Sequence, residues 1–354
     1  MHAIVPPYLL ARIAATREPT WARAAQAARA TLEIPREYRP VRSRIRMSIE
    51  EPGTLVFEGA PAPDRTISDA RQLEQLPGTR VRGEDDPPTG DIAVDEAFDG
   101  LGATFDFYWE AYQRSGIDGA GAPLLATVHY GRDYDNAFWN GERMVFGDGD
   151  GEVFVGFTGS LSVIAHELTH GVTQHSAGLV YRDQSGALNE SVSDVFGALV
   201  EQYARHETTE QASWLVGEGL FLPAVEGRAL RSMRDPGTAY DDDVLGSDPQ
   251  PAHMDDYITT SEDDGGVHLN SGIPNRAFVL TADALGGHAW ERAGQIWYDT
   301  LTGSLNPRVE FPGFAAATVR AAAARYGEVS AEVDAVRDGW NGVGVTIDGG
   351  EARP

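Results

Sequence analysis

The pattern His166-Glu167-Leu168-Thr169-His170 constrains the fold of this 354-residue chain more than any other feature. It lies in a segment whose apolar residues recur at helical spacing, so the two histidines, four residues apart, project from one helix face. Two imidazoles one turn apart can hold a zinc ion, and Glu167 beside them can reach a water on that metal. Because the chain has no cysteine, any metal must be bound by histidines and carboxylates.

A second helical pattern supplies candidate partners for this pair. It opens at Asn189-Glu190, and Glu190 and Asp194 share one face at i, i+4. Glu190 can be the third ligand, which leaves the fourth position to water, as in catalytic rather than structural zinc sites. Asp194 can accept the free ring N–H of a ligand histidine and fix its tautomer, and we expect Asn189 to support the ligands in the same way. The alternative is an ordinary amphipathic helix whose carboxylates serve only as surface or capping groups.

Secondary-structure patterns divide the chain into two halves. Residues 54–157 have the pattern of short strands and turns, including Leu55-Val56-Phe57 and 124–130, with one helix expected at 94–115. Helical periodicity then prevails, and helices are predicted at 161–175, 187–203, 275–285, 289–301, 314–326 and 330–340. A β-rich half followed by a helical half predicts an α+β protein of two lobes with a cleft between them.

Charge is distributed very unevenly along the chain. Residues 1–48 contain nine arginines and three glutamates, a net charge of +6, whereas the remainder contains 19 arginines and 51 acidic residues, a net charge of −32. A basic arm on an acidic body predicts a segment that docks on the rest of its own chain, with a solvated tail as the alternative. A helix is expected at 21–32, ended by Pro35 and Pro40.

The same features limit the partners of the chain. A strongly acidic body argues against nucleic acid or an anionic membrane surface as the main partner. No apolar run is long enough to span a bilayer. The segment 1–15 lacks a basic start, and its apolar stretch is interrupted by Pro6, Pro7 and Arg12, so it does not have the pattern of a conventional signal peptide.

Several motifs, in the same order along the chain, resemble the thermolysin family of neutral zinc metallopeptidases. Over residues 76–345 the matching motifs are Asp135-Asn136-Ala137-Phe138-Trp139-Asn140-Gly141, the His166 helix, Ser176-Ala177-Gly178-Leu179-Val180-Tyr181, the Glu190 helix, Arg231-Ser232-Met233 and Gly265-Gly266-Val267-His268. The run Val5-Pro6-Pro7-Tyr8-Leu9-Leu10 further resembles the short pro-segment of the protealysin-like branch. The resemblance implies a two-lobed thermolysin-like fold: a pro-segment at 1–50, a β-rich N-terminal lobe at 51–180 that carries the zinc helix, and a helical C-terminal lobe at 181–354.

The resemblance also implies catalytic roles. One zinc ion would lower the pKa of its water and polarise the scissile carbonyl, while Glu167 takes the proton and passes it to the leaving amine. His268 and Tyr181 match the positions that donate to the oxyanion, and Asp263 matches the acid that orients His268. Judged by sequence alone, His268 is an ordinary loop histidine and Tyr181 a core aromatic residue.

Substrate-binding residues are carried over from the family in the same way. Asn136 and the carbonyl of Ala137 match the edge that pairs with an extended substrate, and Arg231 matches the group that holds a substrate carbonyl, with a structural ion pair as the alternative. The pocket for the residue after the cleaved bond would be lined by apolar side chains, which predicts cleavage before bulky hydrophobic residues. These are Phe154, Phe157, Val163, Val216 and Leu230. Phe157 is larger than the usual aliphatic residue, which narrows the pocket.

The calcium sites of the family are where this sequence departs from it. Glu201 and Glu218 remain as possible residual ligands, but Ser162, Ser213 and Leu215 stand where relatives offer carboxylates. Calcium requires six to eight oxygens, several of them anionic, so we expect a reduced site that does not hold a calcium pair.

Together these patterns predict a zinc endopeptidase made as a zymogen, with peptide or protein substrates and the pro-segment as its intramolecular inhibitor. One alternative is a non-catalytic scaffold, which predicts a broken catalytic position, whereas Glu167, Glu190, Tyr181 and His268 are all present. The other is a zinc exopeptidase, which needs an added group for a substrate terminus. Secretion is expected by family resemblance, with an intracellular zymogen as the alternative.

Overall fold

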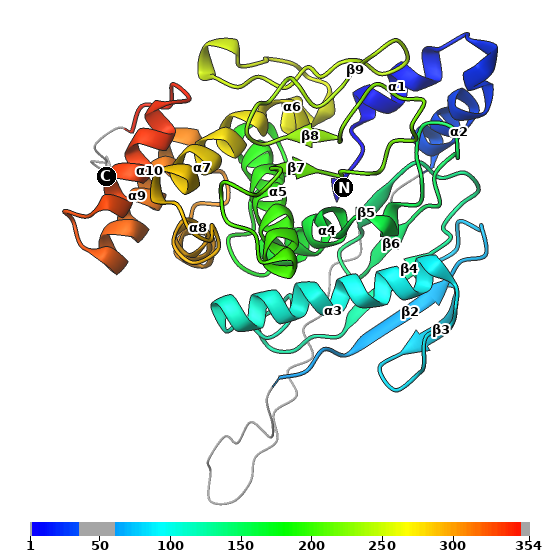
Figure 1. Ribbon diagram of the computed structural model, residues 1–354, viewed down its shortest axis with the longest axis horizontal. Coiled ribbons are helices and arrows are strands. Elements are labelled where there is room, and N and C mark those ends of the chain that lie inside the picture. Colours follow the sequence, from blue (N-terminus) through cyan, green and yellow to red (C-terminus); the bar gives the residue numbers. More distant parts are fainter. Residues whose placement is uncertain (1, 35–60, 348–354) are drawn as a thin grey trace, which may run out of the picture.

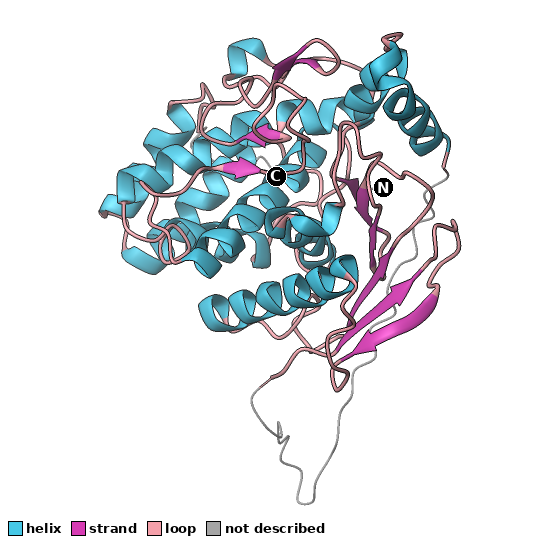
Figure 2. Cartoon of the chain, turned by 45° about the vertical axis from the view of Figure 1, so that its right-hand side comes forward, coloured by secondary structure: helices cyan, strands magenta, loops and turns pink. Residues whose placement is uncertain are grey.

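The architecture is a six-stranded mixed sheet joined to a large helical region (Figures 1 and 2). The computed structural model describes residues 2–34 and 61–347. The strand order is β1-β5-β6-β4-β2-β3, with β4 parallel to β2 and β6 and the other neighbours antiparallel. The strands are β1 His2–Ala3, β2 Arg65–Asp69, β3 Thr79–Gly83, β4 Leu124–Val128, β5 Ala137–Trp139 and β6 Met144–Phe146.

Three long helices connect the sheet to the rest of the protein: α3 Ile92–Tyr112, α4 Leu161–Gln174 and α5 Asp183–Arg205. The carboxylate of Asp91 caps α3 by accepting the backbone N–H groups of Ala93 and Val94. Helix α4 packs against α5 on one side and β5 on the other, and twelve of its fourteen residues are buried. Its two histidines are therefore held in the interior, and their polar atoms require partners there.

The C-terminal helices are α6 Asp263–Asn270, α7 Gly272–Leu285, α8 Ala293–Thr302, α9 Phe311–Tyr326 and α10 Ala331–Asn341. Of these, α7 to α10 gather at the end of the molecule opposite β2 and β3, and α6 lies nearer the centre (Figure 1). Between α5 and α6 lie the short pairs β7 Leu215–Val216 with β8 Arg231–Ser232 and β9 Asp241–Asp242 with β10 Gly246–Ser247. The predicted α+β fold, with a β-rich lobe, a helical lobe and the His166 helix between them, is confirmed.

The N-terminal segment forms two helices, α1 Pro7–Ala15 and α2 Ala22–Glu33. The helix expected at 21–32 is confirmed by α2. Helix α1 was not predicted because Pro6 and Pro7 look like breakers, whereas Pro7 takes the first helical position, where a missing N–H costs nothing. The expected stops at Pro35 and Pro40, and the expected strand at 55–57, lie outside the described residues.

One apolar core runs through most of the molecule. Leu9, Leu10 and Ile13 of α1 belong to the same buried cluster as residues of α3, α4, α5 and the C-terminal helices. Within the described part of the chain, no helix has both the length and the apolar character needed to cross a bilayer.

Candidate active site

Helices α4 and α5 bring three predicted ligands together. The ligand atoms of His166, His170 and Glu190 all lie within 4.8 Å of one another, and all three side chains are buried. The two Nε2 atoms are 3.1 Å apart, and Glu190 oxygens lie 3.5 Å from His166 Nε2 and 3.4 Å from His170 Nε2. Because α4 and α5 pack side by side, residues one turn apart on α4 face one residue of α5.

The opposite ring nitrogens of both histidines are held by hydrogen bonds. His166 Nδ1–H donates to Asp194 at 2.8 Å, and His170 Nδ1 lies 2.8 Å from Asn189 Oδ1 and 3.0 Å from Ser193 Oγ. These contacts leave each Nε2 lone pair aimed at the common centre. Asn189 and Asp194 thus each contact one of the two histidines on the side away from the common centre.

Asp194 also carries an ion pair. Its two oxygens accept Arg231 Nε at 2.9 Å and Nη2 at 2.8 Å, and Asn275 Nδ2 donates to it at 2.8 Å. Burial alone would raise the pKa of Asp194, but the charge of Arg231 and the hydrogen bond from His166 hold that pKa well below its usual range. Asp194 is therefore a permanent anion that fixes both a ligand histidine and Arg231.

The donor set fits zinc. Two imidazole nitrogens and a carboxylate converge in a buried place, and among the described residues Glu190 Oε2 has no hydrogen-bond partner. A buried charged oxygen of this kind is costly without a cation or a donor. A His₂Glu set of three protein ligands is the type found in catalytic zinc sites, where the fourth position stays open.

Glu167 lies beside the predicted substrate edge. Its side chain is fully buried, and Oε2 accepts the backbone N–H of Trp139 in β5 at 2.8 Å. The carboxylate of Glu167, the residue after His166 in α4, thus lies beside β5, the strand that contains Ala137.

Tyr181 and His268 meet on the other side of Glu190. Tyr181 Oη donates to Glu190 Oε1 and lies 3.2 Å from His268 Nε2. His268 Nδ1 lies 2.6 Å from Asp263 Oδ1, and its backbone N–H donates to Asp263 Oδ2 at 2.9 Å. Burial opposes the charged form of His268, but Asp263 and Glu190 outweigh it and raise its pKa to about 9.

A sharp change of chain direction in α6 creates this arrangement. Asp263, Asp264, Gly265 and Gly266 all have positive φ, from 50° to 91°. Gly265 has a φ of 91°, and a Cβ there would lie 3.0 Å from the backbone nitrogen of Asp183, so the turn strongly favours glycine. The kink lets Asp263 reach the ring that follows it by five residues.

Backbone groups of the N-terminal segment occupy the predicted substrate edge. Ile4 N–H donates to the Ala137 carbonyl at 3.1 Å, and Asn136 accepts Val5 N–H at 2.9 Å while donating to its carbonyl at 3.0 Å. Arg231 Nη1 donates to the Ile4 carbonyl at 3.0 Å. Strand β1 continues this pairing, with Ala3 opposite Phe138 in antiparallel register.

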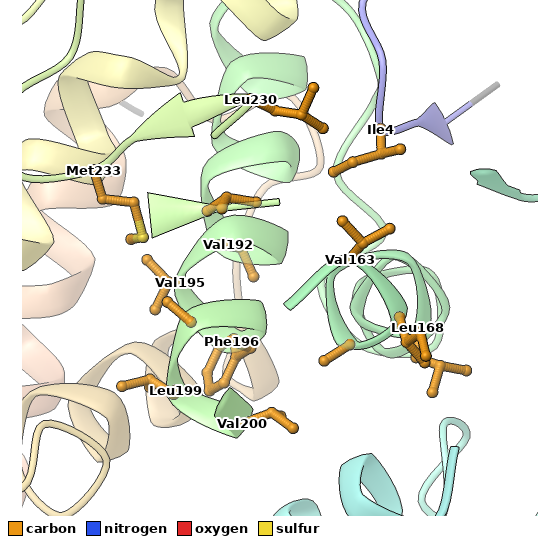
Figure 3. Close-up of a cluster of buried hydrophobic side chains, with 14 of the residues drawn as sticks. Ile4, Val163, Leu168, Val192, Val195, Phe196, Leu199, Val200, Leu230 and Met233 are labelled. Atoms are coloured by element: carbon orange, nitrogen blue, oxygen red, sulfur yellow. The ribbon is translucent and has the colours of Figure 1, made fainter. Parts of the chain in front are cut away.

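The five predicted pocket residues are all buried and belong to the main apolar core. Ile4 belongs to it and is fully buried, and its side chain lies between Val163 and Leu230 (Figure 3). The rings of Phe154 and Phe157 pack at 5.5 Å between centroids. Val216 faces the same cluster from β7.

One of the two possible calcium ligands, Glu201, forms an ion pair with an arginine side chain. Arg205 Nη2 lies 2.5 Å from Glu201 Oε1, one helical turn away on α5. Burial raises the pKa of Glu201, and Arg205 offsets part of this effect. Glu218 and Ser213 are exposed, and Leu215 is buried.

Helices α1 and α2 dock on the acidic body through polar contacts. The N-terminus of α2 is capped by another part of the chain, because Ala24 N–H donates to Glu152 at 2.9 Å. Arg23 pairs with Asp133 at 2.6 Å, and Thr31 Oγ1 accepts the backbone N–H of Asp135 at 3.0 Å. These contacts agree with a basic arm lying on an acidic surface.

Three supporting groups escaped the sequence analysis. Ser193 lies inside the recognised Asn189–Asp194 run, so its proximity to a ligand histidine could have been proposed. Asn275 and the backbone N–H of Trp139 are brought in by tertiary packing and carry no local signal.

Comparisons with known proteins agree with this geometry. Family models described as the thermolysin metallopeptidase catalytic domain and alpha-helical domain match residues 65–174 and 177–345. An extracellular metalloprotease of Pectobacterium carotovorum subsp. carotovorum is 52% identical over 98% of this chain and 96% of its own length. Protease PrtS of Photorhabdus sp. (strain Az29) is 50% identical over 80% of this chain and 76% of its own. The solved precursor of protealysin, a metalloproteinase from Serratia proteamaculans, superposes with a TM-score of 0.87 at 48% identity, over 98% of this chain and 100% of that one.

Proposed function

Because the chain belongs to the thermolysin family of metallopeptidases, and is therefore a zinc metalloendopeptidase made as a zymogen, we propose the role of each side chain in its site. The observation that carries the assignment is the convergence of His166, His170 and Glu190, with Glu167, Tyr181 and His268 around them.

His166, His170 and Glu190 are the zinc ligands, and Asn189 and Asp194 orient the two imidazoles. When bound, zinc supplies a Lewis acid that polarises the scissile carbonyl and lowers the pKa of water. Holding three ligands in a buried site before the metal arrives keeps the cost of ordering them low.

Glu167 is the general base. Its carboxylate takes a proton from the attacking water and delivers it to the leaving nitrogen. The N–H of Trp139 fixes one of its oxygens and so orients the carboxylate.

Tyr181 and His268 stabilise the negative charge that develops on the substrate carbonyl oxygen. Burial and the nearby Glu190 charge raise the pKa of Tyr181 well above its usual value, which keeps its hydroxyl a donor. Asp263 holds the His268 ring so that Nε2 points into the site.

Asn136, Ala137 and Arg231 align an extended substrate backbone, and the cluster around Val163 and Leu230 takes the side chain after the cleaved bond. Ile4 in that cluster supports a preference for aliphatic residues. The two packed rings of Phe154 and Phe157 reduce the pocket, so leucine and isoleucine should be favoured over phenylalanine.

The N-terminal segment inhibits the enzyme by lying in its cleft. Residues 3–5 use the hydrogen bonds that a substrate backbone would use, and α1 and α2 hold them there.

The chain division remains 1–50 for the pro-segment, 51–180 for the N-terminal lobe and 181–354 for the C-terminal lobe. The ion pair of Arg205 with Glu201 takes up one of the two possible calcium ligands, which supports a reduced calcium site. The name of the Pectobacterium relative supports an extracellular site of action.

A quenched peptide with leucine after the cleavable bond tests these roles. The chain is folded at full length, its pro-segment is then removed by proteolysis, and the peptide should be cleaved. Glu167→Ala should keep one zinc per chain but lose about 10²- to 10⁴-fold in kcat, as expected for a general base. The matched control, Glu328→Ala at an exposed position, should keep full activity. Turnover by zinc-loaded Glu167→Ala at the normal rate would contradict the assignment.

A further inference from the structure

One peptide bond of the N-terminal segment lies among the groups assigned to the reaction. The carbonyl oxygen of Ala3 is 3.0 Å from His268 Nε2, and the next backbone N–H, of Ile4, donates to the Ala137 carbonyl. Ala3, Ile4 and Val5 are all fully buried. The segment also runs antiparallel to β5, so its direction is defined as well as its position.

Two independent contacts identify the same bond. On one side, the group that would stabilise an oxyanion touches the carbonyl of Ala3. On the other side, Ile4, whose carbonyl is held by Arg231, lies between Val163 and Leu230, two of the residues assigned to the pocket for the residue after the cleaved bond. A shift of one residue would turn Ile4 out of the pocket and face Val5 inward, because successive side chains alternate in an extended chain.

We infer that the enzyme hydrolyses its own Ala3–Ile4 bond, within the same molecule, once zinc is bound. This inference rests on the proposed function. Water adds across the bond: its hydroxyl joins the carbonyl carbon of Ala3, the C–N bond breaks, and the proton passes through Glu167 to the nitrogen of Ile4. The products are the segment that ends in the new carboxylate of Ala3 and a chain that begins with the amine of Ile4.

This cut does not activate the enzyme. Leu9, Leu10 and Ile13 remain in the core, and Ala24 and Thr31 keep their contacts with the acidic body. Ile4 stays in its pocket through Arg231 and the buried cluster, as a tethered product. The released segment keeps the pairing of β1 with β5 and the contact of Ala3 with His268, but it is no longer tethered to the helices, and it leaves. The mature cleft is therefore exposed only when the rest of the pro-segment departs.

Intact-mass measurement tests the cut directly. Full-length protein is freed of metal by a chelator, zinc is added in slight excess, and samples are stopped in acid at intervals. We expect the loss of residues 1–3, with a first-order rate that does not change on 100-fold dilution. Glu167→Gln should keep its full mass, and its thermal unfolding should match that of wild type, while Glu328→Gln should be cut like wild type.

A second measurement does not depend on turnover. In full-length, zinc-loaded Glu167→Gln, amide hydrogen exchange at Ile4 and Val5 should be at least about 100-fold slower than in an unstructured peptide of the same sequence. Free exchange at Ile4 would place another bond in the cleft and overturn the inference.

The outcomes separate the two claims. An N-terminus that stays intact after zinc loading overturns the inference, and if the mature enzyme still cleaves the quenched peptide, the proposed function stands. If the peptide also stays uncut, the proposed function fails with it. A cut whose rate rises with protein concentration occurs between molecules and likewise overturns the inference.

Discussion

Truncating Ile4 should raise the peptidase activity of the zymogen while its pro-segment is still attached, an activity called the leak below. The side chain is fully buried between Val163 and Leu230, and the substitution Ile4→Ala removes three carbons from that contact while leaving every backbone hydrogen bond possible. At about 0.8 kcal/mol per buried methylene, docking weakens by about 2.4 kcal/mol. Because about 1.4 kcal/mol corresponds to a factor of ten, the open fraction should rise by about 50-fold.

The assay is the initial rate at which full-length, zinc-loaded protein cleaves a quenched peptide. Ile4→Val removes one carbon and should raise the leak only by about fourfold, since about 0.8 kcal/mol is lost. Ile92→Ala is the matched control, because Ile92 is 74% exposed on α3 and far from any role in docking. Intact mass at the end of each assay confirms that residues 4–354 are still one chain.

The graded series makes the reasoning refutable. If Ile4→Ala leaks no more than Ile92→Ala, the side chain does not anchor the segment in the cleft. If Ile4→Val leaks as much as Ile4→Ala, buried area does not set the strength of docking, and the backbone contacts with Asn136 and Arg231 must dominate instead.

Three further predictions concern the supports of the site and of the segment. Asp194→Asn should lower zinc affinity by about 10- to 100-fold, measured by chelator competition, because the side chain that orients His166 is no longer an anion. The same change leaves Arg231 buried without its partner, which should lower the free energy of unfolding in urea by about 3–5 kcal/mol. The hydrogen bond to Asp148 raises the pKa of His129 to about 9, so this residue should stabilise the fold fully below pH about 6.5. About 1–2 kcal/mol of the free energy of unfolding should be lost as pH rises through 9, and urea unfolding of His129→Gln should lack this pH dependence. Glu152→Ala removes the acceptor of Ala24 N–H at the start of α2 and should raise the zymogen leak by about fivefold, since such a cap contributes about 1 kcal/mol.

Short-range patterns predicted the metal site because its geometry is helical. Two histidines four apart, and Glu190 with Asp194 four apart, fix which side chains share a face before any tertiary contact is known. What these patterns leave open is how the two faces meet, and here the order of motifs and their family resemblance supplied the answer.

The occupant of the cleft could not be predicted from local patterns. Strand β1 has two residues, too few for any periodicity, and its pairing with β5 joins positions more than 130 apart in the chain. The sequence also offered two roles for Arg231, a substrate-binding group or a structural ion pair. Its guanidinium has enough donors for both, and it binds Asp194 and the Ile4 carbonyl together.

The double use of Arg231 has a consequence for how this zymogen can be opened. Asn136 and Arg231 hold residues 4 and 5 with the same atoms that would hold a substrate, so a variant of either should loosen the segment and weaken substrate binding together. Leak activity would then change little, since the two effects oppose each other. Contacts made only by α2, such as Ala24 with Glu152, have no counterpart in a bound peptide. Control of the zymogen can therefore be separated from catalysis by changing the pro-segment itself, as in Ile4→Ala, or contacts made only by its helices. A leak that rises in Glu152→Ala but not in Arg231→Lys would show this.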